Sequence, residues 1–320
     1  MNAKPQEAAP PEETGDIVLA RPRGFCAGVE RAIAIVERAL DRFGAPIYVK
    51  HAIVHNRHVV ERLERRGAIF VETLEEVPTG SRVIFSAHGV PPEAHRQAES
   101  RGLAVLDATC PLVTKVHLEA RRYSNEGRTI FLIGHVGHVE VVGTRGEAPD
   151  AIQIISTVEE AERAQADNPE RVAFLTQTTL SLDDTRAIVE VLRRRFPALS
   201  GPAKDDICYA TQNRQNAVLA LSREVDLILV VGSEKSSNSN RLVEVARTQG
   251  LPAYLVESHA DVREEWLRGI RRIGITAGAS APEDVVQALA EALAKRGSAT
   301  LRELEVVREN VVFALPPQLR

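Results

Sequence analysis

Short runs of apolar and β-branched residues alternate with longer helix-type patterns along almost the whole chain. This alternation is typical of parallel β-sheets covered by helices, because two parallel strands need a long crossover connection that is usually a helix. A length of 320 residues leaves room for two or three small domains of this kind. We therefore predict an α/β fold. The expected strands lie at 17–20, 47–49, 83–86, 105–107, 130–134, 172–176, 227–231 and 273–276.

The three cysteines occupy equivalent places in this pattern. Cys26, Cys110 and Cys208 each stand at the start of an expected helix, and about one small α/β domain separates each from the next. We therefore predict three small parallel-sheet domains that each present one cysteine to a shared centre. The expected boundaries are 17–109, 110–207 and 208–296, after a disordered, polar and Pro-rich tail at 1–16.

A cysteine at a helix N-terminus is expected to have a lowered pKa, which favours the metal-binding thiolate. An odd number of widely spaced cysteines argues against a disulfide framework. Three possibilities remain at this point. The thiols are unrelated and buried, they hold zinc with an open fourth position, or they hold a 4Fe–4S cluster in which one iron lacks a protein ligand.

Polar side chains follow the expected strands, at the end of a parallel sheet where ligands bind. Hydroxyls, amides and imidazoles near helix N-termini make a good cradle for phosphate. The chain has neither a GxxxxGK[ST] element nor a GxGxxG after a strand, which argues against ATP-driven and dinucleotide sites. We assign structural roles to His51, His58, His95, His117 and His259, and expect Asn56 and Asn238 to cap helices. The candidates are His55, His88, His135, His138, Glu140, 176–179, Ser236, Ser237, Asn238 and Ser280.

The composition limits the classes of partner. A net charge of −4 argues against nucleic acid or an anionic membrane surface as the main partner. The longest apolar runs, such as 227–231, are far shorter than a membrane span, and the first sixteen residues lack the apolar stretch of a signal peptide. We therefore expect a cytoplasmic protein that binds no membrane.

Nine sequence blocks, in order between Arg23 and Ser280, resemble the 4-hydroxy-3-methylbut-2-enyl diphosphate reductase family. They are RGFCAGVERAI, IVHN, SAHGV, DATCPLV, GHVE, TQTTLS, ICYAT with NRQ, SSNSNRL and AGAS. Enzymes of this family catalyse the last step of the non-mevalonate isoprenoid pathway. The resemblance implies a monomeric cloverleaf of three α/β domains around a central cluster. It also implies that the ENVVFALP stretch, within 297–320, is a final strand that returns to the first domain.

The resemblance further implies the reaction and the site. Cys26, Cys110 and Cys208 would hold a 4Fe–4S cluster whose fourth iron binds the substrate hydroxyl. Glu140, helped by Thr178, would supply protons. Ferredoxin or flavodoxin would supply two electrons, and the products would be isopentenyl and dimethylallyl diphosphate. The residues that would bind the substrate are His55, His88, His138, Thr178, Ser236, Ser237, Asn238 and Ser280. Val139 stands where the family usually has proline.

Three other functions compete with this interpretation. A hydro-lyase would use an open iron for dehydration and would not depend on a reductant. A cluster-bearing redox or oxygen sensor would have no substrate. A three-thiolate zinc hydrolase would be colourless.

Overall fold

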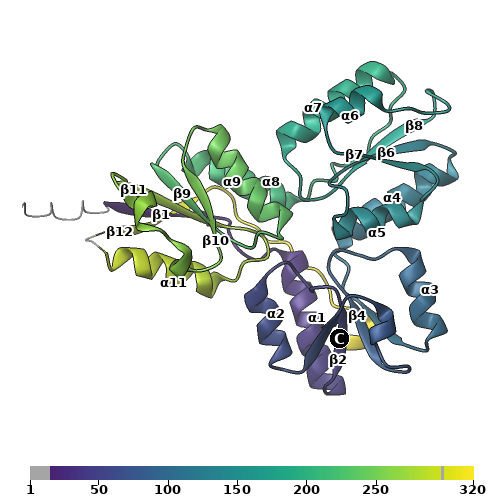
Figure 1. Ribbon diagram of the computed structural model, residues 1–320, viewed down its shortest axis with the longest axis horizontal. Coiled ribbons are helices and arrows are strands. Elements are labelled where there is room, and N and C mark those ends of the chain that lie inside the picture. Colours follow the sequence, from purple (N-terminus) through teal and green to yellow (C-terminus); the bar gives the residue numbers. More distant parts are fainter. Residues whose placement is uncertain (1–14, 297–298) are drawn as a thin grey trace, which may run out of the picture.

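The computed structural model describes residues 15–296 and 299–320. In this part of the chain every pairing between strands is parallel, and the strands form sheets of five, four and three strands. The prediction of an α/β fold with parallel sheets is confirmed. Figure 1 shows one lobe around each sheet. Most of the expected tail, 1–14, lies outside the described residues, and the first strand already begins at Asp16.

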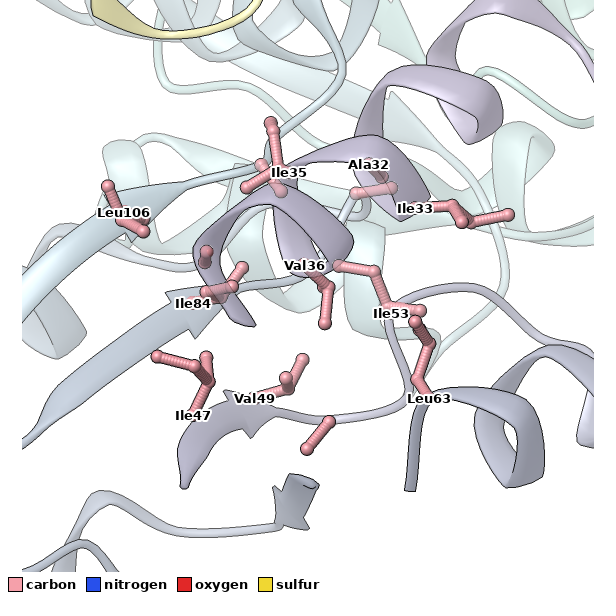
Figure 2. Close-up of a cluster of buried hydrophobic side chains, with 14 of the residues drawn as sticks. Ala32, Ile33, Ile35, Val36, Ile47, Val49, Ile53, Leu63, Ile84 and Leu106 are labelled. Carbon is pink, nitrogen blue, oxygen red and sulfur yellow. The ribbon is translucent and has the colours of Figure 1, made fainter. Parts of the chain in front are cut away.

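The first lobe is built on the four-stranded sheet, in the order β3-β2-β4-β5. Helix α1 begins after Cys26 and buries Ala32, Ile33 and Val36, whose helical spacing forms one apolar face. Figure 2 shows this face packed over Val49 and its neighbours on the sheet. The elements are α1 (Ala27–Phe43), β2 (Ile47–Lys50), α2 (Arg57–Glu64), β3 (Ala68–Val71), η1 (Leu74–Glu76), β4 (Arg82–Phe85), α3 (Pro92–Ser100) and β5 (Ala104–Asp107).

The second lobe is built on the three-stranded sheet, in the order β7-β6-β8. Both faces of this sheet are covered, because separate apolar clusters form around Phe131 and around Leu132, which are neighbours on the central strand. The elements are α4 (Pro111–Asn125), β6 (Thr129–Ile133), α5 (Val139–Glu147), β7 (Ile152–Ile155), α6 (Val158–Arg163), β8 (Val172–Thr176) and α7 (Leu182–Arg195).

The third lobe is built on the five-stranded sheet, in the order β10-β9-β11-β1-β12. We placed the strand at 17–20 with the domain 17–109, and this placement is wrong. Strand β1 pairs with β11 and β12, and its side chains enter the apolar cores on both faces of that sheet. The elements are β1 (Asp16–Arg21), α8 (Tyr209–Leu221), β9 (Leu227–Val231), α9 (Ser237–Thr248), β10 (Ala253–Val256), η2 (His259–Asp261), α10 (Glu264–Leu267), β11 (Arg272–Ala277), α11 (Glu283–Ala294) and β12 (Thr300–Glu305).

The C-terminal segment differs from the expectation in one respect. The last strand is β12, whereas the ENVVFALP stretch that follows has no regular secondary structure. This stretch nevertheless leaves the third lobe and reaches the first. The main-chain oxygen of Ala314 accepts a hydrogen bond of 2.8 Å from Arg31 Nε, and Leu319, in η3 (Pro317–Leu319), joins the apolar core beneath α1. Figure 1 marks the C-terminus beside β2 and β4.

All eight expected strands are present, with ends that differ by at most one residue. The four further strands, β3, β7, β10 and β12, all lie at sheet edges, where one side of the strand is unpaired and the apolar pattern is weaker. Among the described helices, none combines the length and the apolar character that crossing a bilayer requires.

Candidate active site

One cavity of about 110 Å³ lies where the three lobes meet, and all three contribute to its wall. The cavity opens at the carboxyl ends of the strands, as expected for parallel sheets. Every candidate metal-binding, substrate-binding and catalytic residue of the resemblance lines it. These residues are Cys26, His55, His88, Cys110, His138, Glu140, Thr178, Cys208, Ser236, Ser237, Asn238 and Ser280.

The three cysteines hold equivalent positions, directly before the first residues of α1, α4 and α8. Each main-chain N–H of a cysteine donates to the carbonyl of a loop that carries a substrate-binding candidate. Cys26 bonds to Ala279 at 3.2 Å, Cys110 to Ala87 at 3.0 Å and Cys208 to Thr178 at 3.0 Å. These bonds fix each thiol relative to the neighbouring polar wall, so the two sets of residues form one unit.

Gly28 has no side chain, and this leaves room for the thiols of Cys26 and Cys110. A β-carbon built on Gly28 would lie 2.7 Å from Cys110 Sγ and 3.8 Å from Cys26 Sγ, and the first of these distances is a steric clash. On the opposite side, Cys208 Sγ accepts a hydrogen bond of 3.4 Å from the N–H of Thr211 and lies 3.1 Å from its hydroxyl oxygen. The sulfurs of Cys26 and Cys110 therefore border one another across a position without a side chain.

The predicted lowering of the cysteine pKa values is wrong for two of the three thiols. Burial raises the pKa of Cys110 to about 12 and that of Cys208 to about 11. The desolvation of a buried thiolate outweighs the hydrogen bonds that the helix N-termini offer. A coordinated metal reverses this balance, because a metal-bound thiol loses its proton outright. A metal bound at these thiols would therefore release protons on binding.

Three imidazoles from the first and second lobes form one wall. The ring centroids of His55 and His88 are 4.2 Å apart, and His138 stands edge-on to His55 at 5.8 Å. Burial, with the positive charge of nearby Lys235, lowers the pKa of His55 to about 4. Burial and the neighbouring histidines lower the pKa of His138 to about 4, and that of His88 falls well below its usual range. Burial among these protein groups therefore favours the neutral form of all three rings at pH 7.

Hydroxyl and amide groups from the third lobe form the facing wall. Ser236 caps α9, because its hydroxyl accepts a hydrogen bond of 3.3 Å from the N–H of Ser239. Asn238 was expected as a cap but lies inside the helix, where its side-chain oxygen accepts from the N–H of Ala279 at 2.9 Å. The hydroxyl of Ser280 donates to the main-chain oxygen of His55 at 3.2 Å. By contrast, Asn56 caps α2 as predicted.

Glu140 is the buried acid of the site, with only 4% of its surface exposed. Its two oxygens accept hydrogen bonds from Thr178, one from the N–H at 2.6 Å and one from the hydroxyl at 3.0 Å. Desolvation nevertheless raises the pKa of Glu140, which is the direction that a proton donor needs. His138 precedes α5, and its Nδ1 accepts from the N–H of Glu140 at 3.2 Å, so Val139 leaves the turn intact.

The three thiols are spread over the wall of the cavity. In the described ranges no three His, Cys, Asp or Glu side chains form a group that could hold one metal ion. A tetrahedral zinc needs its three thiolates gathered around one centre. A 4Fe–4S cluster spreads its ligands, because each thiolate binds a separate iron. Cys26, Cys110 and Cys208 come from three walls of the cavity, which suits the larger group.

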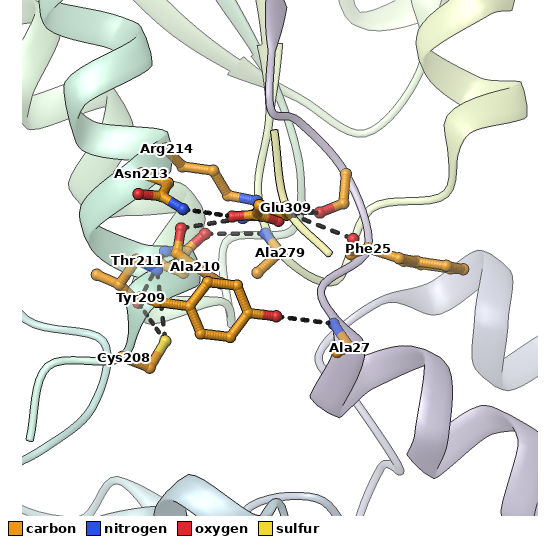
Figure 3. Close-up of polar contacts among 12 residues, drawn as sticks. Phe25, Ala27, Cys208, Tyr209, Ala210, Thr211, Asn213, Arg214, Ala279 and Glu309 are labelled. Carbon is orange, nitrogen blue, oxygen red and sulfur yellow. Dashed lines mark hydrogen bonds and ion pairs between the residues drawn. The ribbon is translucent and has the colours of Figure 1, made fainter. Parts of the chain in front are cut away.

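A buried ion pair supports the loop that carries Cys26. Arg214 of α8 is fully buried, and its guanidinium donates to the main-chain oxygen of Gly24 at 2.7 and 3.1 Å. The same group lies 3.1 Å from the carboxylate of Glu309, which also accepts from the side chain of Asn213 at 2.9 Å. Figure 3 shows Arg214 and Glu309 between the Cys26 loop and the helix that begins after Cys208.

Several of these residues carry no signal in the sequence pattern. Gly28 and Thr211 belong to the site only because they lie beside the thiols in the folded chain. Arg214 and Glu309 pair although 95 positions of the chain separate them. Periodicity does not report such distant contacts. Thr179 lines the cavity, and its hydroxyl lies 3.1 Å from that of Ser237. The sequence pattern singles out Thr179 only as one member of the candidate stretch 176–179.

Comparison with known proteins identifies the family of this chain. The family model described as "LytB protein" matches residues 17–294. The chain belongs to the LytB family. Among LytB relatives, the 4-hydroxy-3-methylbut-2-enyl diphosphate reductase of Aromatoleum aromaticum is 57% identical, over 95% of this chain and 98% of its own. The protein of the same name from Acidothermus cellulolyticus is 56% identical, over 98% of this chain and 92% of its own.

Two solved structures agree with the fold. The E-1-hydroxy-2-methyl-but-2-enyl-4-diphosphate reductase of Plasmodium falciparum superimposes with a TM-score of 0.93 at 40% identity, covering 96% of this chain and 97% of its own. A second structure, named the terminal enzyme of the non-mevalonate pathway, gives a TM-score of 0.63 at 32% identity over 88% of this chain and 99% of its own. Both likenesses extend over nearly the whole chain.

Proposed function

We propose that this chain reduces 4-hydroxy-3-methylbut-2-enyl diphosphate to isopentenyl and dimethylallyl diphosphate, with a 4Fe–4S cluster held by Cys26, Cys110 and Cys208. The observation that carries the proposal is the lining of one cavity, where three thiols, three imidazoles and the buried carboxyl of Glu140 come together. The printed names of relatives that are 53 to 57% identical support the same substrate.

The wall of the cavity suits a diphosphate. Its described lining contains no Lys or Arg, so recognition depends on hydroxyls, an amide and imidazoles. Burial and nearby positive groups lower the pKa values of His55, His88 and His138, which favours their neutral rings. A bound diphosphate supplies negative charge and favours the imidazolium forms. The binding energy of this remote group then positions the allylic carbon.

The reaction breaks one C–O bond and consumes two electrons and two protons. When bound, the cluster supplies the electrons one at a time and a Lewis-acidic iron. Glu140 protonates the leaving oxygen, which departs as water, and a second proton reaches the allylic carbon skeleton. Thr178 holds both carboxyl oxygens of Glu140 and so fixes the direction in which the proton is delivered.

We expect ferredoxin or flavodoxin to deliver the electrons, and we expect one chain to be sufficient, because each of the three thiols comes from a different lobe of the same chain. The three cysteines form no disulfide with one another, which agrees with a cytoplasmic location.

The test begins with protein purified without oxygen and analysed for iron, sulfide and visible absorption. We expect a brown protein with about four irons per chain, and loss of that iron in Cys110→Ser. With excess reductant and the allylic diphosphate, Glu140→Gln should bind substrate and turn over about a hundredfold more slowly. A Glu140→Gln variant that turns over normally would remove this residue from the mechanism.

The same experiments separate the alternatives. Turnover that does not depend on reductant would indicate a hydro-lyase. A brown protein that binds no allylic diphosphate would indicate a sensor. A colourless protein that carries zinc after attempted cluster reconstitution would refute the cluster.

A further inference from the structure

His117, to which we assigned a structural role from the sequence, lies on α4, and its ring lies beside Gly89, the residue that follows the cavity-lining His88. The side chain is buried, with 6% of the residue exposed. Its Nδ1 is 2.9 Å from a carboxylate oxygen of Glu147, and the other oxygen of Glu147 is 3.2 Å from Nε of the half-exposed Arg121. One side of the imidazole is thus connected to a carboxylate that pairs with a cation near the protein surface.

The other ring nitrogen has no partner. Nε2 of His117 is buried and makes no hydrogen bond within the described residues. A β-carbon built on Gly89 would lie 2.9 Å from His117 Cε1 and 3.2 Å from Nε2, and one built on Gly143 would lie 3.4 Å from Cε1. The ring edge therefore occupies a slot between the turn that follows His88 and helix α5. Two glycines leave this slot free.

Helix α5 connects this slot to the active site. Glu140, Gly143 and Glu147 stand three and four residues apart and therefore share one face of the helix. The two carboxylates are separated by two turns, or about 10 Å along the axis. The imidazole of His117 contacts this face at Gly143, between the two acids. A positive charge on His117 also acts on Glu140, where it opposes the rise in pKa that burial causes.

We propose that Glu147 and His117 form a proton relay that reprotonates Glu140 from outside the cavity. The relay depends on the proposed role of Glu140 as proton donor and adds the route by which that donor is restored. The alternative is that His117 only fastens α4 to α5 through its ion pair with Glu147.

Each transfer moves one proton. An Nε2–H bond of His117 breaks and an O–H bond forms on the Glu140 carboxylate through one bridging water. At the same time Nδ1 receives a proton that Glu147 has taken from solvent. Each transfer leaves Glu140 neutral, Glu147 ionised as before and the ring in its Nδ1–H tautomer, so the charges balance. The ring regains its Nε2–H tautomer by turning in the slot beside Gly89 and Gly143. The ionisable groups around the ring are Glu140 and Glu147 on α5, Arg121 on α4, and His88 before the Gly89 turn.

The test compares His117→Ala with His95→Ala, a matched change at an exposed histidine of α3. In the cluster-loaded enzyme with excess reductant, His117→Ala should lower kcat by about tenfold to a hundredfold with little change in KM. It should also enlarge the ratio of rates in H₂O and D₂O, and added imidazole should restore much of the loss. Rates and isotope ratios equal to those of His95→Ala, or a loss that imidazole does not restore, would overturn the relay.

A second measurement needs neither the cluster nor turnover. The infrared C=O band of protonated Glu140, identified by its loss in Glu140→Gln, reports how fast this carboxyl exchanges its proton for deuterium. We expect exchange about tenfold slower in His117→Ala than in His95→Ala, and equal exchange rates would overturn the relay. If the wild-type enzyme does not reduce the diphosphate, the proposed function fails while this measurement still decides the relay.

Discussion

Removing Glu309 leaves a buried guanidinium without its counter-charge. Arg214 has no exposed side-chain surface, whereas Glu309 keeps 15% of its own. In Glu309→Ala the guanidinium keeps only neutral acceptors, the main-chain oxygens of Gly24, Phe25 and Ala210. Breaking a buried ion pair from one side costs about 3–5 kcal/mol. Because Glu309 is slightly exposed, we expect a loss of about 3 kcal/mol in the free energy of unfolding.

The loss can be measured on the cluster-free protein by equilibrium unfolding in urea. Trp266 is the only tryptophan, and it stacks on Tyr254 with ring centroids 3.9 Å apart in the third lobe, so its fluorescence reports the lobe that contains Arg214. Glu305→Ala is the matched control, because Glu305 pairs with the exposed Arg308 in the same terminal region. Exposed pairs contribute about 0–1 kcal/mol, so the control should unfold almost as the wild type does.

One further variant and one further measurement test the role of the ion pair. The double variant Arg214→Met with Glu309→Leu removes both charges and should be more stable than Glu309→Ala alone. Alkylation of Cys26 should also become faster in Glu309→Ala, since Arg214 holds the two carbonyls that precede this thiol. If Glu309→Ala lost no more stability than Glu305→Ala, the main-chain oxygens alone would satisfy Arg214, and the ion-pair argument would be wrong.

Three more predictions concern the cavity. Because the pKa of His138 falls to about 4 from 6.5, the neutral ring contributes stability above pH 6.5 that is lost as the pH falls towards 4. The loss in the free energy of unfolding is at most about 3 kcal/mol. Urea unfolding measured against pH should show this slope in the wild type and a shallower one in His138→Asn. Gly28→Ala should sharply reduce the iron bound per chain, since its β-carbon would lie 2.7 Å from Cys110 Sγ, and normal iron content would show that the thiol can move aside. Thr178→Val removes one hydrogen bond that favours the carboxylate of Glu140, so the pKa of Glu140 should rise further, visible as a shift to higher pH in the infrared titration of its carboxyl band.

The local pattern was sufficient for much of the site. Strand endings followed by cysteine, histidine or serine predicted the residues that line the cavity, because parallel strands place their carboxyl ends at one edge. The resemblance implied that Glu140 supplies protons, and its burial raises its pKa in the direction that a proton donor needs. It gave the wrong direction for Cys110 and Cys208, because the depth of burial that dominates their pKa values is a property of the assembled lobes.

The sequence by itself therefore determined the α/β class, the interior strands of all three sheets together with the edge strands β5 and β8, and the chemical types of the site. All of these depend on local periodicity and residue chemistry. Only the tertiary structure decided that β1 lies in the third lobe between β11 and β12, although α1, which follows it, packs in the first. It alone placed Glu309 against Arg214, and His117 between Glu140 and Glu147. Pairing and burial depend on contacts between distant segments, and a local pattern does not specify which segments meet.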